Sequence, residues 1–174
     1  MIFIISDTHF YHDKMVEYCG RPTNHTEIIK NNLLSVPFTK NDVLIHLGDI
    51  CIGHDQEVHD TIIKPLPCKK WLTRGNHDKK TDSWYLENGW DWVGSQFTKV
   101  CFGKVILFSH VPVRWDGIYD LNIHGHFHNN DHRSLEPELV AIRNERHRLL
   151  SIEKMHYKVV SLEMFLKMTP PTLK

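Results

Sequence analysis

The stretch IFIISDTH at residues 2–9 joins a short apolar run directly to a carboxylate and an imidazole. The largely β-branched run at residues 2–6 predicts a buried strand, and Asp7 and His9 follow at its carboxyl end. Alternate residues of an extended segment point the same way, so both side chains can face one ligand. Ligands of α/β sheets gather beyond the carboxyl ends of the strands. The stretch therefore predicts an α/β sheet with a site at the edge where its strands end.

Four further polar clusters follow apolar runs in the same way. They are GD at residues 48–49, GNHD at 75–78, SH at 109–110 and GHFH at 125–128. Carboxylate, amide and imidazole groups suit Mn²⁺, Fe²⁺, Zn²⁺ or Co²⁺, and the absence of thiolate from the clusters argues against a structural zinc finger. Together the clusters supply enough oxygen and nitrogen atoms for two metal ions. Two neighbouring metal ions are a common means of attacking a phosphate ester with water.

Composition limits the partners that the chain can bind. Its 174 residues fit one domain, and we expect residues 1–174 to form it. Lys plus Arg equals Asp plus Glu at 21 each, so the chain lacks the excess of positive charge that holds extended nucleic acid. Any phosphate group must therefore be held locally, and we expect a small phosphate ester as the substrate.

The sequence also predicts where the protein acts. No apolar run is long enough for a transmembrane helix, so we expect no membrane association. The N-terminal segment has no basic region before its apolar run, which argues against a signal peptide. The four cysteines are scattered and form no C-x-x-C pair, so we expect reduced thiols in the cytoplasm. The 14 histidines also indicate metal binding, because His is the commonest metal ligand.

Periodicity predicts strands and helices that alternate along the chain, which is the pattern of an α/β fold. Strands are expected at residues 2–6, 42–47, 70–73, 90–100, 104–108, 121–123, 149–153 and 157–160. Helices are expected at residues 26–36, 56–64, 82–88 and 162–167. The polar and charged stretch at residues 129–148 gives no clear pattern.

The five clusters, in this order, resemble those of the calcineurin-like metallophosphoesterase superfamily. The match covers roughly residues 1–128, and the tail is similar to the closing strands and helix of compact, single-domain bacterial and phage-type members. One such motif is weak support, whereas five in order are strong. The resemblance implies a four-layer α/β/β/α sandwich with the site at the strand ends. It also implies a metal-dependent phosphoric ester hydrolase.

The resemblance further implies seven ligands for two divalent metal ions. They form a first set of Asp7, His9 and His128, a second set of Asn76, His110 and His126, and a bridging Asp49. Mn²⁺ is the metal we expect first, with Fe²⁺, Zn²⁺ or Ni²⁺ as alternatives, since availability decides as much as ligand type. Each residue also has a structural alternative; a lone Asp after a strand usually caps a turn.

His77 and Asp78 follow the ligand Asn76 and have catalytic roles by resemblance. Water activated by the metal ions would attack phosphorus in line with the leaving oxygen. His77 would then protonate or stabilise the leaving group, while Asp78 would fix the orientation of the His77 ring. A role for His77 outside direct contact with the substrate also fits its position.

Three more residues are candidates for binding the substrate. His12 lies three residues after His9, Arg74 precedes the Asn-His-Asp cluster, and Arg21 lies in the loop CGRP. Each has an ordinary alternative, which is an exposed loop histidine for His12, a surface ion pair for Arg74 and a loop anchor for Arg21.

Departures from better known relatives narrow the expected activity. Purple acid phosphatases have a Tyr three residues after the bridging Asp, where this chain has Ile52, so a tyrosinate-bound ferric site is not expected. The short chain leaves little room for a segment that caps the site. An open site favours small phosphodiesters and would also allow a homodimer. The alternatives are a phosphomonoesterase or nuclease of the same family, or a non-enzymatic metal-binding scaffold; the intact Asn-His-Asp cluster favours an enzyme.

Overall fold

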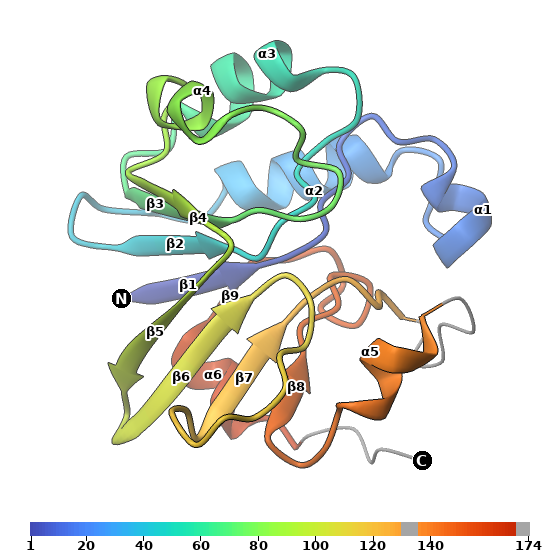
Figure 1. Cartoon of the computed structure of the whole chain (residues 1–174). Coiled ribbons are helices and arrows are strands. Elements are labelled where there is room, and N and C mark those ends of the chain that lie inside the picture. Colours follow the sequence, from blue (N-terminus) through green and yellow to red (C-terminus); the bar gives the residue numbers. More distant parts are fainter. Residues whose placement is uncertain (130–135, 170–174) are drawn as a thin grey trace.

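The apolar runs of the sequence form the centres of two stacked β-sheets, which Figure 1 shows between layers of helices. This computed structural model describes residues 1–129 and 136–169. The first sheet has the strand order β4-β3-β2-β1-β9. Its strands are β1 (Ile2–Ile5), β2 (Val43–His46), β3 (Lys69–Thr73), β4 (Trp92–Gly94) and β9 (Val160–Ser161). β1 to β4 run parallel, and β9 is antiparallel to its neighbour β1.

The second sheet has the strand order β5-β6-β7-β8. Its strands are β5 (Gln96–Cys101), β6 (Lys104–Ser109), β7 (Leu121–His124) and β8 (His147–Leu149). β6, β7 and β8 run parallel, whereas β5 forms a hairpin with β6. The loops that carry the polar clusters therefore start at the carboxyl ends of parallel strands in both sheets.

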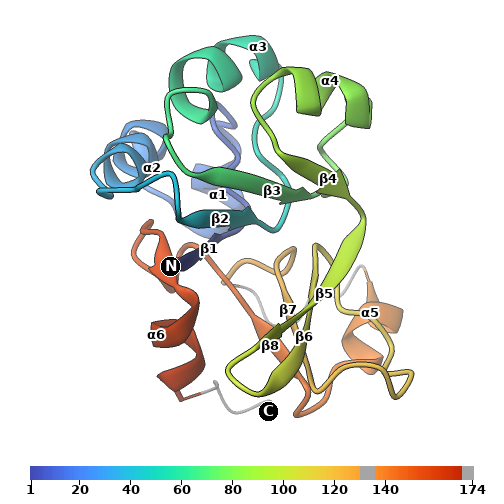
Figure 2. The ribbon, with the colours of Figure 1, turned by 90° about the vertical axis from the view of Figure 1, so that its left-hand side faces the viewer.

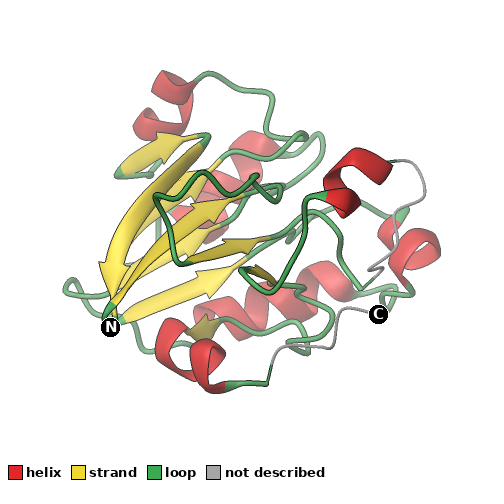
Figure 3. Cartoon of the chain, turned by 60° about the horizontal axis from the view of Figure 1, so that its bottom comes forward, coloured by secondary structure: helices red, strands yellow, loops and turns green. Residues whose placement is uncertain are grey.

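Helices cover the outer sides of the two sheets. They are α1 (Met15–Cys19), α2 (His25–Leu34), α3 (Asp55–Val58), the π-helical η1 (His59–Ile63), α4 (Asp82–Glu87), α5 (Pro137–Ala141) and α6 (Leu162–Lys167). Figures 1 and 2 show α2, α3 and α4 over the first sheet, with α5 and α6 flanking the second. Figure 3 shows the same separation, with strands inside and helices outside. The prediction of a four-layer α/β/β/α sandwich is confirmed.

The core consists of two apolar clusters, one on each face of the first sheet. Ile5 and Leu44 pack beneath the helices, whereas Ile4 and Ile45 pack between the two sheets. Neighbouring strand residues point to opposite faces, so a sheet that is covered on both sides needs continuous apolar runs. This is why β1 and β2 lack the polar–apolar alternation of a half-exposed strand.

The strand expected at residues 90–100 is instead two strands in different sheets. β4 ends at Gly94 in the first sheet, and β5 begins at Gln96 in the second. Aromatic and β-branched residues occur in both strands and no proline separates them, so the sequence reads as one strand. The chain crosses between the layers at Ser95.

Other expected elements differ from the structure in length or type. The helix expected at residues 56–64 is α3 followed by η1. The strand expected at 149–153 survives only as the end of β8, and residues 152–157 form turns before β9. Sequence periodicity gives no sign of α1 and α5, because five residues are too few for a helical repeat to show. Within residues 1–129 and 136–169, no helix has the length and apolar character needed to span a bilayer.

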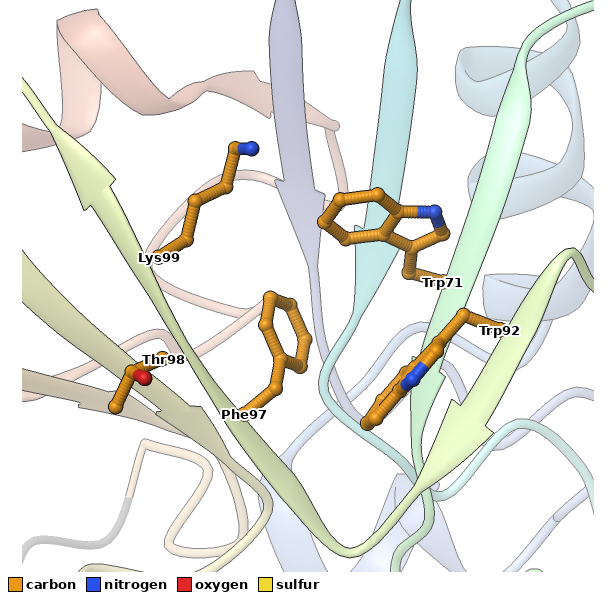
Figure 4. Close-up of a pocket in the computed structure, with 5 residues that line it drawn as sticks. All are labelled: Trp71, Trp92, Phe97, Thr98 and Lys99. Atoms are coloured by element: carbon orange, nitrogen blue, oxygen red, sulfur yellow. The ribbon is translucent and has the colours of Figure 1, made fainter.

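Aromatic side chains line a cavity of about 260 Å³ near the crossing from β4 to β5, shown in Figure 4. Trp71 of β3, Trp92 of β4 and Phe97 of β5 provide the rings. The Lys99 ammonium lies 5.2 Å from the centre of the Trp71 ring, so the chain's own cation already faces this ring. None of the predicted site residues lines the cavity.

Candidate metal centre

The loops after β1 and β2 run side by side and are joined through their backbones. The amide of Asp7 donates to the carbonyl of Gly48 at 2.9 Å, and the amide of His9 donates to the carbonyl of Asp49 at 3.0 Å. These bonds continue the pairing of the two strands beyond their ends. As a result, two polar clusters that are about 40 residues apart in sequence meet at one edge of the sheet.

Two glycines allow the backbones of the site to approach closely. Gly48 has a φ of 94°, and a Cβ atom there would lie 2.7 Å from Nδ1 of His110. A Cβ atom on Gly125 would overlap the Ser6 hydroxyl and the Asp7 carboxylate. A side chain at either position would displace a predicted ligand.

Several of the predicted ligands have left-handed backbone conformations, which non-glycine residues rarely adopt. Positive φ values between 45° and 74° occur at Asp7, His9, Asp49, His126 and His128. Such conformations cost free energy and persist where the surrounding structure holds them for a functional arrangement. Their concentration at these loops supports a site whose side-chain directions matter more than local stability.

The first predicted set of ligands converges in the structure. Asp7, His9 and His128 are buried, and one potential ligand atom from each lies within 4.8 Å of the other two. The Asp7 carboxylate accepts hydrogen bonds from the Ser6 hydroxyl and from the backbone amide of His126, at 3.0 and 3.1 Å for the latter. These bonds hold the Asp7 carboxylate in place and leave the rings of His9 and His128 available as ligands.

The second predicted set meets beside the first. Nε2 of His110 lies 3.1 Å from Oδ1 of Asn76 and 3.1 Å from Nδ1 of His126. Asp49, His110 and His126 also have potential ligand atoms within 4.8 Å of one another. Asn76 is exposed, whereas the two histidines are buried, so the set faces solvent on the Asn76 side.

Asp49 lies between the two sets. Its Oδ2 atom is 3.5 Å from Nε2 of His9 and 3.4 Å from Nε2 of His110. Its Oδ1 atom accepts a hydrogen bond from the backbone amide of His77 at 2.8 Å. The position between a histidine of each set is the one that a bridging carboxylate requires.

The electrostatics of the cluster fit divalent cations. Burial opposes a charge on His110, but its hydrogen bond to Asp49 and the negative charges of Asp7 and Asp49 outweigh burial and raise its pKa to about 9. The buried carboxylates of Asp7 and Asp49 therefore favour a positive charge at His110. Burial lowers the pKa of His9, which keeps that imidazole neutral and suitable as a ligand. Oxygen and neutral nitrogen donors around two carboxylates suit first-row divalent metals.

The sequence matches the calcineurin-like phosphoesterase family over residues 1–167. The chain belongs to this family. Membership implies metal-dependent hydrolysis of phosphate esters, and it confirms the family predicted from the five motifs.

Two relatives are similar to this phosphoesterase over nearly its whole length. The uncharacterized protein MJ1445 of Methanocaldococcus jannaschii is 28% identical over 180 residues, which cover 96% of this chain and 90% of that protein. The crystal structure of AQ665, a protein of unknown function from Aquifex aeolicus, has 30% identity and a TM-score of 0.73. That match covers 96% of this chain and 98% of AQ665. Neither relative's name states a substrate.

A cleft of about 260 Å³ lies beside the predicted metal ligands, and two further histidines line it. His77 and His12 line it together with Asp49 and Asn76. The His77 ring centre lies 5.2 Å from that of His9, and the His12 ring centre lies 6.1 Å from that of His77. Both histidines therefore border the same cleft as the predicted ligands, and their contact with a substrate stays a prediction.

Asp78 has a different role from the one predicted. Its carboxylate accepts hydrogen bonds from the backbone amides of Asp49 and Gly75, both at 2.8 Å, and of Ile50 at 3.0 Å. Burial raises its pKa to about 6 despite these bonds. Among the described residues, the structure records no hydrogen bond from the ring of His77 to the Asp78 carboxylate. Asp78 therefore joins the loops after β2 and β3, and the expectation that it orients His77 needs correction.

The prediction that Arg21 binds substrate is wrong, and its alternative as a loop anchor holds. Arg21 is buried, and it donates to the carbonyl oxygens of Thr8 at 2.8 Å and Asp7 at 2.7 Å. Nη2, which donates to Asp7, also donates to Glu153 at 2.7 Å, and Nε donates to Glu153 at 2.9 Å. Arg21 is committed to these partners and lines neither of the clefts beside the predicted ligands.

Arg74 lies beside the centre in a second cleft. This cleft has a volume of about 340 Å³ and also contains Asn76, Lys79 and Ser95. Nε of Arg74 is 2.8 Å from a carboxylate oxygen of Asp82, so the surface ion pair expected as the alternative is present. The same side chain nevertheless borders a cleft that adjoins the metal centre.

Two glutamates next to the centre escape sequence analysis. Oε1 of Glu153 lies 3.1 Å from Nδ1 of His128, and Oε2 of Glu136 lies 2.7 Å from Nε2 of His126. Glu136 falls in the stretch at residues 129–148 that has no clear pattern, and Glu153 falls at the end of an expected strand. Nothing in the sequence around either residue indicates a histidine partner.

The ionisation of Glu153 leads to a testable dependence of stability on pH. Burial alone would raise its pKa, but the hydrogen bond from His128 and the charge of Arg21 outweigh burial and lower the pKa from 4.5 to about 2. A carboxyl with a lowered folded-state pKa stabilises the fold fully above its ordinary pKa of 4.5, and this stabilisation is lost as the pH falls toward 2.

We therefore expect the free energy of unfolding of the metal-free protein to fall more steeply with acid than that of Glu153→Gln. Between the two pKa values the difference in slope should approach about 1.4 kcal/mol per pH unit. Urea unfolding in the presence of a chelator, at a series of pH values from about 5 to about 3, measures both slopes. Equal slopes would show that Glu153 is not ionised against these partners.

Proposed function

We propose that this chain is a phosphodiesterase that uses two divalent metal ions, Mn²⁺ in the first instance, to hydrolyse small diesters. The observation that carries the proposal is that the centre opens onto two clefts. The cleft with His12 and His77 and the cleft with Arg74 share Asn76, which is a predicted ligand. A phosphodiester has two organic groups on one phosphate, whereas a monoester has one. Two clefts that meet at the centre support the diester.

The seven predicted ligands are proposed to hold the ions, with Asp49 between the two sets. When bound, the ions would polarise the phosphoryl oxygens and lower the pKa of a water molecule toward neutrality. Hydrogen bonds to groups that are not themselves predicted ligands hold the ligand side chains and loops in position. The Ser6 hydroxyl holds Asp7, the amides around Asp78 hold the loops, and the Leu47 carbonyl lies 2.7 Å from Nδ1 of His110.

His77 is proposed to assist the leaving group. Its backbone amide is held by Asp49 at 2.8 Å, and its ring borders the first cleft. From there the imidazole would carry a proton to the departing oxygen, which suits a histidine at neutral pH. His12 would contact the same part of the substrate from the loop before α1.

The two clefts differ in chemistry, which suggests how a diester lies across the centre. The first includes the apolar Met15 and the exposed aromatic ring of Tyr18 as well as Lys14, so it suits an aromatic group. The second includes Lys79 and also Arg74, which is paired with Asp82, and the buried Asp78; its exposed lysine suits a negatively charged group. The cytoplasmic location and the homodimer expected from the sequence stay predictions.

Hydrolysis of two model substrates tests the proposal. With Mn²⁺ supplied, bis-p-nitrophenyl phosphate should be cleaved with a higher kcat/KM than p-nitrophenyl phosphate, because it places a group in each cleft. The opposite preference would favour the phosphomonoesterase alternative. Failure to cleave either substrate, with two ions bound, would favour a non-enzymatic scaffold. Parallel assays with Fe²⁺, Zn²⁺ and Ni²⁺ identify the metal that supports the highest rate.

The second cleft can be tested with Lys79→Ala. We expect KM to rise roughly fivefold for a diester with a charged second group, such as a dinucleotide, since an exposed ionic contact contributes up to about 1 kcal/mol. The KM for bis-p-nitrophenyl phosphate, whose second group is neutral, should not change. Lys80→Ala is the matched control, because Lys80 is an adjacent exposed lysine that does not line the cleft. An equal effect of both variants would argue against the assignment.

A further inference from the structure

The two histidines of the GHFH motif present opposite ring nitrogens to the centre. His128 directs Nε2 toward Asp7, at 3.8 Å from Oδ1. His126 directs Nδ1 toward His110, at 3.1 Å from Nε2. Only one residue separates the two histidines in the sequence, so the motif itself does not decide which nitrogen each one offers. Something else in the structure must set the orientation of each ring.

A glutamate lies at the remaining nitrogen of each ring. Glu153 is 3.1 Å from Nδ1 of His128, and Glu136 is 2.7 Å from Nε2 of His126. A carboxylate at one imidazole nitrogen holds the proton there and leaves the other nitrogen free to bind a metal. Each histidine thus has a carboxylate partner of its own, and the two partners come from different parts of the chain.

The Glu153 side chain is held firmly in its position. Arg21 donates to Oε1 of Glu153 through two nitrogens, at 2.7 and 2.9 Å, and the Ser151 hydroxyl donates to Oε2 at 2.8 Å. Arg21 also donates to the carbonyl of Asp7 at 2.7 Å. A single buried network therefore connects the backbone of one ligand, Asp7, with the ring of another, His128.

Glu136 has a different setting. It is the residue before α5, and its side chain is 29% exposed, compared with 5% for Glu153. Glu136 lies in the segment between β7 and β8, whereas Glu153 lies in the turn that precedes β9. Because no hydrogen bond or ion pair is recorded between the two glutamates among the described residues, removal of one should leave the other pair intact.

We infer that Glu153 and Glu136 are positioning residues, each of which orients one histidine and so sets the affinity for one of the two metal ions. The inference rests on the proposed two-metal centre. Glu153 acts on the ion held by Asp7, His9 and His128, and Glu136 acts on the ion held by Asn76, His110 and His126. Loss of such a partner typically weakens metal binding by about 10- to 100-fold.

Calorimetric titration with Mn²⁺ tests this assignment one site at a time. The Asn76→Ala background removes a ligand of the second ion. The tighter binding event measured in this background is therefore that of the first ion. There, Glu153→Gln should weaken Mn²⁺ binding by about 10- to 100-fold, and Glu136→Gln should have no effect. In the His9→Ala background, which removes a ligand of the first ion, the two effects should be reversed.

The matched control is Glu57→Gln, because Glu57 lies 3.1 Å from Nδ1 of His54 in an exposed glutamate–histidine pair that lines neither cleft. It should change neither affinity. A result in which Glu153→Gln weakens both sites equally, or neither, would overturn the inference. These affinities are measured without substrate, so they decide the inference independently of the hydrolysis assays that decide the proposed function.

A measurement on the unaltered protein guards against variants that fail to fold. In the Zn²⁺-loaded wild type, long-range ¹⁵N correlation spectra report which nitrogen of each histidine carries the proton. We expect the proton of His128 on Nδ1 and that of His126 on Nε2, each facing its glutamate. The same tautomer at both histidines would show that the two glutamates do not set the ring orientations.

Discussion

Asp49→Asn should abolish measurable hydrolysis and weaken the binding of both metal ions. Oδ2 of Asp49 lies 3.5 Å from Nε2 of His9 and 3.4 Å from Nε2 of His110, so one atom serves both sets of ligands. The amide has no negative charge to share between two cations. Replacement of residues that only support a ligand costs about 10- to 100-fold, so loss of the shared ligand should exceed about 100-fold in kcat/KM.

Elemental analysis of the bound metal and the rate with bis-p-nitrophenyl phosphate measure the two effects of Asp49→Asn. Asp120→Asn is the control, because Asp120 is an exposed carboxylate that accepts a hydrogen bond from the backbone amide of Val105, outside the centre. It should retain two ions and the wild-type rate. A fully active Asp49→Asn protein would exclude Asp49 as the bridging ligand.

His77→Ala should retain both metal ions but hydrolyse diesters about 10²- to 10⁴-fold more slowly, which is the usual contribution of a general acid. The bond from His77 to Asp49 uses the backbone amide, so the alanine variant keeps it. Only the ring at the edge of the cleft is lost. The metal ligands should therefore stay in place while proton donation to the leaving oxygen fails.

A series of aryl phosphodiesters with different leaving groups separates this role from others. The loss of rate in His77→Ala should be largest for the most basic leaving groups, which depend most on a proton. His12→Ala is the comparison, because His12 lines the same cleft and is expected to contact substrate without donating the proton. It should slow all members of the series by a similar factor. The same uniform slowing in His77→Ala would contradict the acid role.

The sequence was sufficient to predict the fold class and the elements that carry the donors. Each polar cluster follows its own apolar strand, so the pattern is local and can be read without knowledge of the fold. The structure brings all seven predicted ligands to one edge of the two sheets, although their roles in metal binding stay a prediction. The family that their order indicates is confirmed by the match over residues 1–167.

The predictions that needed correction depended on distant partners. Arg21 looked available for a phosphate, but Glu153, which is 132 residues away, and two backbone carbonyls occupy its donors. Asp78 follows His77 directly, yet its carboxylate binds the amides of the loop after β2. In both cases the nearest residues in sequence are not the residues that the side chain contacts.

The sequence alone determined which chemical groups this protein brings to the predicted metal centre and at which strand ends they lie, because strand periodicity and the residues that follow a strand are local properties. Only the tertiary structure decided that Asp49 lies between the two ligand sets and which nitrogen each histidine directs toward the centre. It also decided that Glu136 and Glu153 face the opposite nitrogens. The physical reason is that these contacts join segments far apart in the chain, and their distances depend on how two sheets and their connecting loops pack together.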